Sequence, residues 1–335
     1  MNNKPIIIIC AALAVIAAAS VFTAAVTDNK RRENDEKLVA AMAELSSSKL
    51  EIDKLRNELD EIKLSVPDVT EAPAEAYSPP VTDDNTIYIY DNGDTIKEYP
   101  PIEGAKLHDY DMSLLKTDEK KHKVLYDDNG NARSRFGIDV SSYQTDIDWN
   151  AVAADGVEFA ILRGGYRGYE TGSLSEDKYF RRNMEGAYAA GIDIGVYFFS
   201  QALTEEEAAE EADYILGLIT ETGVTPTLPI IFDWEFPTDE DPARTDGMDG
   251  AMQTKCCRVF CDRIREAGFS PMYYATISTA LFRYDMGALS DIPLWIAEYY
   301  AQTDFVYDFK MWQYSCSGKV DGIDSLVDFN IYIEQ

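Results

Sequence analysis

Two acidic residues close one strongly apolar segment of the chain. Residues 228–232 (Leu-Pro-Ile-Ile-Phe) predict a strand buried on both faces, and Asp233 and Glu235 follow at its carboxyl end. Side chains two positions apart on a strand point to the same side, so both carboxyl groups are expected to lie together. Burial and mutual repulsion would separate their pKa values and leave one acid protonated and the other ionised. This pair is suited to cleaving a glycosidic bond; the alternative is the solvated start of a loop.

The elements that would position this pair alternate between strand and helix from Phe136 onward. Predicted strands cover residues 136–140, 159–163, 192–199, 228–233, 271–275, 294–297 and 310–314. Predicted helices cover residues 177–190, 205–218 and 255–267, and Thr204 followed by three glutamates is a typical helix start. About seven or eight βα units predict an α/β fold, a trimmed TIM-like (β/α) barrel with parallel strands.

Further polar and aromatic residues fall at the ends of the predicted strands, where barrels of this kind carry their chemistry. Asp139 ends the first strand, and Asp328 follows the seventh. Candidates for binding a sugar ring or its hydroxyl groups at the same mouth are Tyr197, Tyr299, Trp312 and Gln313. We interpret Trp295 as a core residue. A structural alternative for Asp139 and Asp328 is the capping of a turn.

Composition excludes several functions. A net charge of −30 excludes binding to nucleic acid, which requires stripes of Lys and Arg, and argues against anchoring on anionic lipid headgroups. His108 and His122 are the only histidines, and neither has a Cys or His at ligand spacing. We therefore predict no metal site and no histidine-based triad. Arg163-Gly164-Gly165 lacks the Lys-Ser/Thr of a nucleotide-binding loop, so no nucleotide site is expected there.

Residues 1–32 are predicted to form a transmembrane anchor or a signal segment. The stretch 6–26 carries no charge and is long enough to cross a bilayer core of about 30 Å. Its alanine-rich second half leaves cleavage as a signal peptide open. Lys30-Arg31-Arg32 by themselves would place the following chain inside the cell, but long domains translocate largely regardless of such charges. We expect a single-pass membrane protein with the barrel outside, or a secreted protein if the segment is cleaved.

Residues 33–64 are predicted to form a short coiled coil. Apolar residues recur every seven positions at Leu38, Leu45, Ile52 and Leu59, with charged residues between them. About four heptads would allow homo-oligomerisation, and a solvated monomeric helix is the alternative.

An acidic, proline-rich linker (65–86) and a small extension of unassigned role (87–135) precede the barrel domain (136–335). Within the extension, residues 91–94 (Asp-Asn-Gly-Asp) and 128–130 (Asp-Asn-Gly) predict two turns.

Residues 136–335 resemble the glycoside hydrolase family 25 lysozymes, which are N-acetylmuramidases. The matching segments are 137–144, 147–149, 191–200, 233–235, 311–314 and 327–330. The resemblance implies a trimmed β/α barrel without a cofactor and peptidoglycan as the partner, cut at the β-1,4 bond between N-acetylmuramic acid and N-acetylglucosamine. It also implies that Glu235 is the proton donor, with Asp233, Asp139 and Asp328 around it. Asp233 would stabilise an oxocarbenium-like centre, orient the substrate's acetamido group or activate water.

Two positions depart from the family pattern. Thr145 stands where a glycine is common, and residues 163–166 (Arg-Gly-Gly-Tyr) replace a segment that contains Lys and ends in Glu-Gly. Three other functions remain open: a non-catalytic barrel that binds wall polysaccharide, a chitinase-like glycosidase, and a membrane scaffold that works through its coiled coil. The chitinase pattern would require acids at Leu228 and Ile231.

Overall fold

The computed structural model describes residues 87–91, 95–99, 101–235 and 244–334, with side chains from residue 101 onward. The transmembrane segment, coiled coil and linker predicted for residues 1–86 lie outside these residues. Within the described part of the chain, no helix combines the length and the apolar character needed to cross a membrane.

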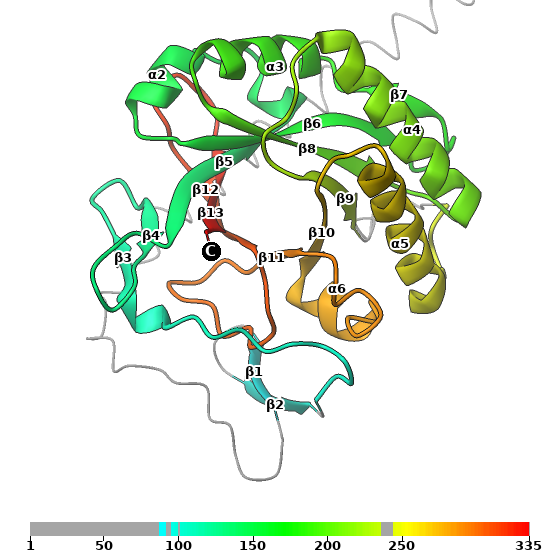
Figure 1. Cartoon of the computed structure of the whole chain (residues 1–335), viewed down its shortest axis with the longest axis horizontal. Coiled ribbons are helices and arrows are strands. Elements are labelled where there is room, and N and C mark those ends of the chain that lie inside the picture. The colour runs from blue at the N-terminus through cyan, green and yellow to red at the C-terminus, as the bar shows by residue number, and fades with distance from the viewer. Residues whose placement is uncertain (1–86, 92–94, 100, 236–243, 335) are drawn as a thin grey trace, which may run out of the picture. The chain divides into compact units, whose positions relative to one another are not determined.

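Eight strands of the described chain form a closed barrel (Figure 1). They are β5 (Ser134–Val140), β6 (Phe159–Arg167), β8 (Asp193–Ser200), β9 (Ile230–Trp234), β10 (Pro271–Thr276), β11 (Leu294–Ala297), β12 (Met311–Gly318) and β13 (Val327–Ile333). The neighbours follow the order β5-β13-β12-β11-β10-β9-β8-β6, and pairing of β5 with β6 closes the ring. A short ninth strand, β7 (Leu174–Glu176), pairs antiparallel with β6 outside the ring. The prediction of an α/β barrel is confirmed: the fold is mixed α/β, built around an eight-stranded barrel.

The prediction of an all-parallel, TIM-like barrel is wrong for the last strand. Neighbouring strands from β5 round to β12 are parallel, but β13 runs antiparallel to both β12 and β5. Only residues 319–326 connect β12 to β13, and they contain no helix. So short a connection returns the chain antiparallel, because a parallel return needs a crossover of a dozen or more residues. Asp328 therefore lies within a strand, not after one.

Helices cover one side of the barrel. They are α2 (Trp149–Ala154), α3 (Phe180–Ala189), α4 (Glu205–Thr222), α5 (Gly250–Glu266) and α6 (Ile277–Phe282). Helices α3 to α6 pack mainly on β6, β8, β9 and β10. Helix α4 begins where the sequence predicts, because the Thr204 hydroxyl accepts from the Glu207 amide. Helix α5 begins earlier than predicted because Asp249 caps it.

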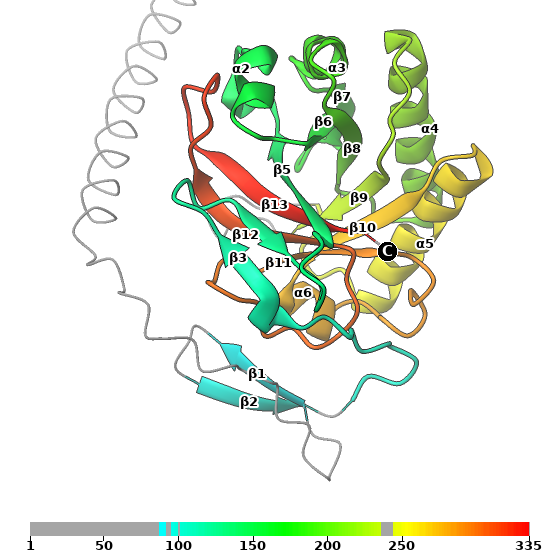
Figure 2. The same cartoon turned by 60° about the vertical axis from the view of Figure 1, so that its left-hand side comes forward.

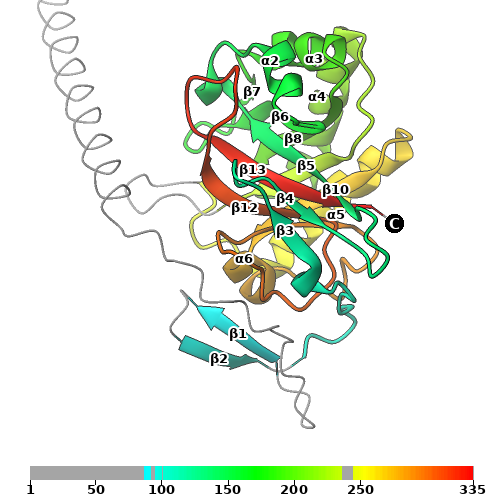
Figure 3. The same cartoon turned by 90° about the vertical axis from the view of Figure 1, so that its left-hand side faces the viewer.

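Residues of the extension cover much of the other side. Its hairpin of β3 (Leu115–Thr117) and β4 (Lys123–Leu125) lies against β5 and β13 (Figures 2 and 3). Leu125 is completely buried, and the His122 ring stacks on Phe136 with 3.9 Å between ring centroids. The Lys123 amide donates to the Tyr314 hydroxyl on β12 at 3.1 Å. The segment 101–133 is thus packed as part of the barrel domain, and β5 begins two residues before the predicted boundary.

The two turns predicted in the extension join antiparallel pairs. Strands β1 (Ile87–Asp91) and β2 (Thr95–Tyr99) form a hairpin whose turn residues 92–94 lie outside the described residues. Tyr126 and Ala132 form an isolated antiparallel bridge, and between them Gly130 adopts a φ of 82°. A glycine tolerates this left-handed conformation because it lacks a Cβ atom.

Alternation along each strand divides the core into two layers. On β9, Ile230, Phe232 and Trp234 belong to the layer between barrel and helices, whereas Ile231 belongs to the barrel interior. Asp233 shares the parity of Ile231 and therefore points inward at the end of the strand. This parity places the predicted acid pair at the mouth of the barrel.

Candidate active site at the carboxyl ends of the strands

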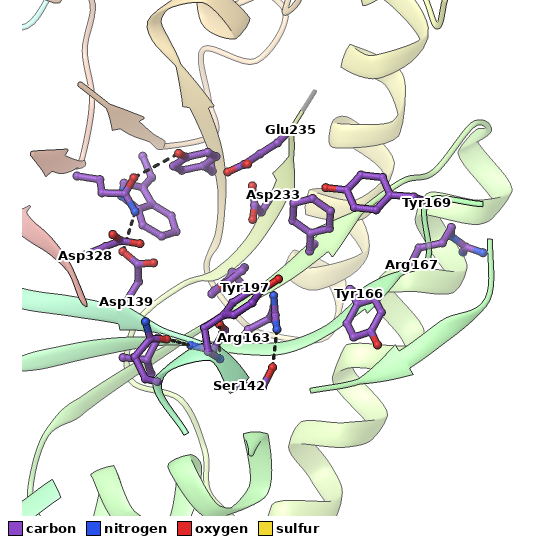
Figure 4. A pocket seen from close by; sticks show the side chains of 18 of the residues that line it. Asp139, Ser142, Arg163, Tyr166, Arg167, Tyr169, Tyr197, Asp233, Glu235 and Asp328 are labelled. Carbon is purple, nitrogen blue, oxygen red and sulfur yellow. Dashed lines mark hydrogen bonds between the residues drawn. The ribbon is translucent and has the colours of Figure 1, made fainter. Parts of the chain in front are cut away.

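A pocket of about 680 Å³ opens at the carboxyl ends of the barrel strands (Figure 4). All four predicted acids line it: Asp139, Asp233, Glu235 and Asp328. They come from β5, from β9 and the residue after it, and from β13, and barrel closure brings them together.

The acids of β9 lie in a setting that favours their protonated forms. Asp233 is buried, and its Oδ1 makes no hydrogen bond within the described chain. Burial, then Glu235 and then Asp139 raise the pKa of Asp233, whereas Arg163 lowers it. Burial and Asp139 also raise the pKa of Glu235, while a hydrogen bond with Tyr274 lowers it. Two carboxyl groups that resist ionisation together are suited to dividing the roles of acid and anion.

The second pair of acids spans the antiparallel junction of β5 and β13. Asp139 and Asp328 are direct cross-strand partners. Burial raises the pKa of Asp139 to about 6, opposed by hydrogen bonds from Asn330 and Gln313. Burial and the charge of Asp139 raise the pKa of Asp328 to about 8. At neutral pH this favours an ionised Asp139 beside a protonated Asp328.

Two amides hold Asp139 in place. Its Oδ2 accepts from Gln313 Nε2 and from Asn330 Nδ2, each at 2.8 Å. The Asn330 amide is oriented by Trp295 Nε1, which donates to its Oδ1 at 2.9 Å. The Gln313 amide is oriented by the Tyr299 hydroxyl, which donates to its Oε1 at 2.8 Å. Both amides therefore present N–H groups to Asp139 and favour its ionised form.

The predicted sugar-binding residues are only partly confirmed as pocket residues. Tyr197, Tyr299 and Gln313 line the pocket. Trp312 does not: it is completely buried in the outer layer, and its Nε1 donates to the Glu298 carbonyl at 2.8 Å. The prediction for Trp312 is corrected because Met311 and Gln313 occupy the inward positions of β12. Trp295 is a core residue, as predicted, but it also forms part of the pocket lining.

Several pocket residues were not predicted from the sequence. Tyr274 is the register partner of Asp233 on β10, and the same strand-end rule that selected Tyr197 would have found it. Asn330, which does not line the pocket but donates to Asp139, was also missed; it lies two residues beyond Asp328 on the same side of β13. Phe199, the last residue of the predicted strand 192–199, also lines the pocket. The other missed aromatic residues are exposed rim tyrosines outside the predicted strands: Tyr143, Tyr166 and Tyr169.

The two departures from the family pattern have different positions. Thr145 ends the turn Ser142–Gln144 with a φ of 56°, a conformation that suits the glycine common at this position. Thr145 is not among the pocket residues, whereas Arg163 is.

In the described part of the chain no group of three or more His, Cys, Asp or Glu side chains is arranged to hold a metal ion.

An α/β barrel with acids and tyrosines gathered at one mouth defines a candidate glycoside hydrolase. The sequence model of glycosyl hydrolases family 25 matches residues 138–323, more than half of the chain. The chain belongs to this family.

Individual relatives agree with the assignment. The chain is 28% identical over 200 residues to the autolytic lysozyme of Clostridium acetobutylicum, covering 59% of this chain and 56% of that protein. It is 28% identical over 206 residues to lysozyme M1 of Streptomyces globisporus, covering 58% and 66%. Among solved structures, the spore cortex lytic enzyme SleM of Clostridium perfringens has a TM-score of 0.51 and 26% identity, covering 59% of this chain and 67% of that one. The matches thus span only part of each relative.

Proposed function

We propose that this chain is a peptidoglycan hydrolase that cleaves the β-1,4 bond between N-acetylmuramic acid and N-acetylglucosamine. The observation that carries the proposal is the convergence of Asp139, Asp233, Glu235 and Asp328 on one pocket. Membership of glycosyl hydrolases family 25 and the similarity to two lysozymes support the choice of substrate.

In this proposal Glu235 protonates the glycosidic oxygen of the leaving sugar. It lies half-buried beyond the end of β9, where burial and Asp139 raise its pKa and favour its protonated form. Asp233 assists as an anion beside the developing positive charge, as an orienting group for the acetamido oxygen, or as the activator of water. Asp139, held by its two amide donors, and Asp328 fix the charge distribution around both acids.

Tyrosines around the pocket would hold the glycan. Four have substantial exposure: Tyr143 at 74%, Tyr299 at 50%, and Tyr166 and Tyr169 at 37% each. Aromatic rings at a pocket rim offer flat apolar faces for sugar rings, while Gln313 and Tyr197 lie deeper. The glycan chain would therefore lie across the acids, with its sugar rings stacked on tyrosine rings on both sides of them.

The proposed cellular setting is the cell envelope. Residues 1–32 would tether the chain to the membrane with the barrel outside, or direct its secretion, and residues 33–64 would allow self-association. Fractionation of cells producing the full chain, followed by protease treatment of intact cells, tests this arrangement. A barrel protected from external protease would contradict it.

The activity is tested by digesting purified peptidoglycan with the full chain and analysing the fragments by mass spectrometry. Fragments with reducing N-acetylmuramic acid ends are expected from the wild type and from Glu185→Gln, an exposed acid on α3. Glu235→Gln should release almost none while keeping the wild-type circular dichroism spectrum. Reducing N-acetylglucosamine ends would overturn the bond assignment, and binding without fragments would indicate the non-catalytic barrel.

A further inference from the structure

Arg163 is distinguished among the charged residues of the pocket. It and Arg167 are the two cationic residues that line the pocket. The Arg167 guanidinium is committed elsewhere, because its Nε donates to Glu211 at 2.7 Å and its Nη2 donates to Glu210 at 2.8 Å. Arg163 is also paired with one carboxylate, that of Asp177, but unlike Arg167 it makes no hydrogen bond to the described chain through Nη1, and this side of its guanidinium can face the acids of the site.

The Arg163 guanidinium is held along one edge. Its Nε donates to Asp177 Oδ2 at 2.8 Å. Its Nη2 donates to Ser142 Oγ at 2.9 Å (Figure 4). Asp177 is itself buried and also accepts from the Ser142 amide at 2.9 Å. The rings of Tyr143 and Tyr166 flank the guanidinium, with centroids 5.4 and 5.7 Å from Cζ. Nη1 makes no hydrogen bond to the described chain, so a fixed positive group keeps one side open.

Among the acids of the β5 and β9 strand ends, Asp233 is the one whose ionised form would gain most from a nearby positive charge. Its Oδ1 is buried without a hydrogen-bond donor in the described chain, whereas Asp139 has two amide donors. Among the described residues, the titratable groups that interact with Asp233 are Asp139, Arg163, Tyr169, Tyr197, Glu235, Tyr274 and Tyr284. Burial raises the pKa of Asp233 most, followed by Glu235 and Asp139, whereas Arg163, the one cation in this set, lowers it.

We propose that Arg163 is a positioning residue that allows Asp233 to ionise while Glu235 keeps its proton. This inference rests on the proposed function. The clamp by Asp177 and Ser142 fixes the charge before substrate binds, so the site needs no rearrangement to stabilise the Asp233 anion. A lysine, which the family often has in this segment, would supply the same charge without the planar clamp.

The test is the pH dependence of kcat/KM for peptidoglycan fragments, measured for the full chain. Arg163→Gln and Arg163→Met remove the charge and should shift the acid limb upward by about one pH unit, which lowers kcat/KM about tenfold on that limb. Arg163→Lys keeps the charge and should leave the limb in place, even if the overall rate falls. Arg181→Met, which breaks an exposed ion pair with Glu176 outside the pocket, is the matched control.

Each outcome separates the two proposals. An inactive wild type would contradict the proposed function itself. An active wild type whose neutral variants lose rate equally at every pH would overturn the inference and leave Arg163 a structural clamp. If the neutral variants fail to fold, Arg163→Lys still decides, because a limb displaced by a full unit would show that the clamp matters and the charge does not. Titration of the Asp233 carboxyl carbon by NMR, expected to follow the same limb, checks the group involved.

Discussion

The two sides of the barrel are covered in different ways. Helices α3, α4, α5 and α6 pack on β6, β8, β9 and β10, whereas the segment 101–133 packs its β3–β4 hairpin on β5 and β13. Both coverings bury apolar side chains, since Ile215 of α4 and Leu125 of β4 are each completely buried. The site draws Asp233 and Glu235 from the helix-covered side and Asp139 and Asp328 from the other. A barrel strand can thus be buried by whatever apolar segment the chain supplies, while the positions of the acids are set by the strands that carry or directly precede them.

The largest expected difference between the two sides is the loss of kcat when an acid from each side is replaced. Asp233→Asn should lower kcat on peptidoglycan about 10²- to 10³-fold, because it removes an acid beside the reacting bond. Asp328→Asn should cost about tenfold, because Asp328 acts through Asp139. Single-turnover rates on defined glycan fragments check both values. Equal losses in the two variants would show that the antiparallel side takes part directly.

The two coverings are expected to contribute similarly to stability. Leu125→Ala in the extension and Ile215→Ala in α4 should each lower the free energy of unfolding by about 2–5 kcal/mol, because each leaves a cavity in a buried layer. Urea titration followed by tryptophan fluorescence measures both. A loss below 1 kcal/mol for Leu125→Ala alone would mean that the extension is a dispensable appendage.

The smallest expected effect is a pH-dependent gain in stability. The pKa of Asp328 is raised to about 8 in the folded protein, so its ionisation opposes folding. This carboxyl group costs no stability below about pH 4 and an increasing amount as the pH rises toward its folded value. A pKa shift of this size would cost about 4 kcal/mol at pH 7 if it were fully realised, and solvent screening of the half-buried carboxyl group reduces that cost. Asp328→Asn should therefore be more stable than the wild type at pH 7, by about 1–2 kcal/mol, and nearly equal to it at pH 4. Urea titrations at both pH values check the sign, and a gain that persists at pH 4 would exclude this cause.

The sequence determined the local features of this protein. The apolar run before Asp233 fixed a buried strand, and the two-residue spacing to Glu235 fixed a shared face, because side-chain alternation is a property of the extended backbone itself. Thr204 likewise fixed the start of α4 through a hydrogen bond three residues away. The antiparallel pairing of β1 with β2 and the turn at residues 128–130 were local in the same sense.

Only the tertiary structure decided the features that depend on barrel closure. The direction of β13 follows from its pairing with β12 and β5, and that pairing places Asp328 opposite Asp139. Closure also selects which parity of β12 faces inward, and so it separates Gln313 in the pocket from Trp312 in the outer layer. The clamp on Arg163 joins three separate segments of chain through Asp177 and Ser142. Such contacts arise between residues distant in sequence, and no local pattern of residue types encodes them.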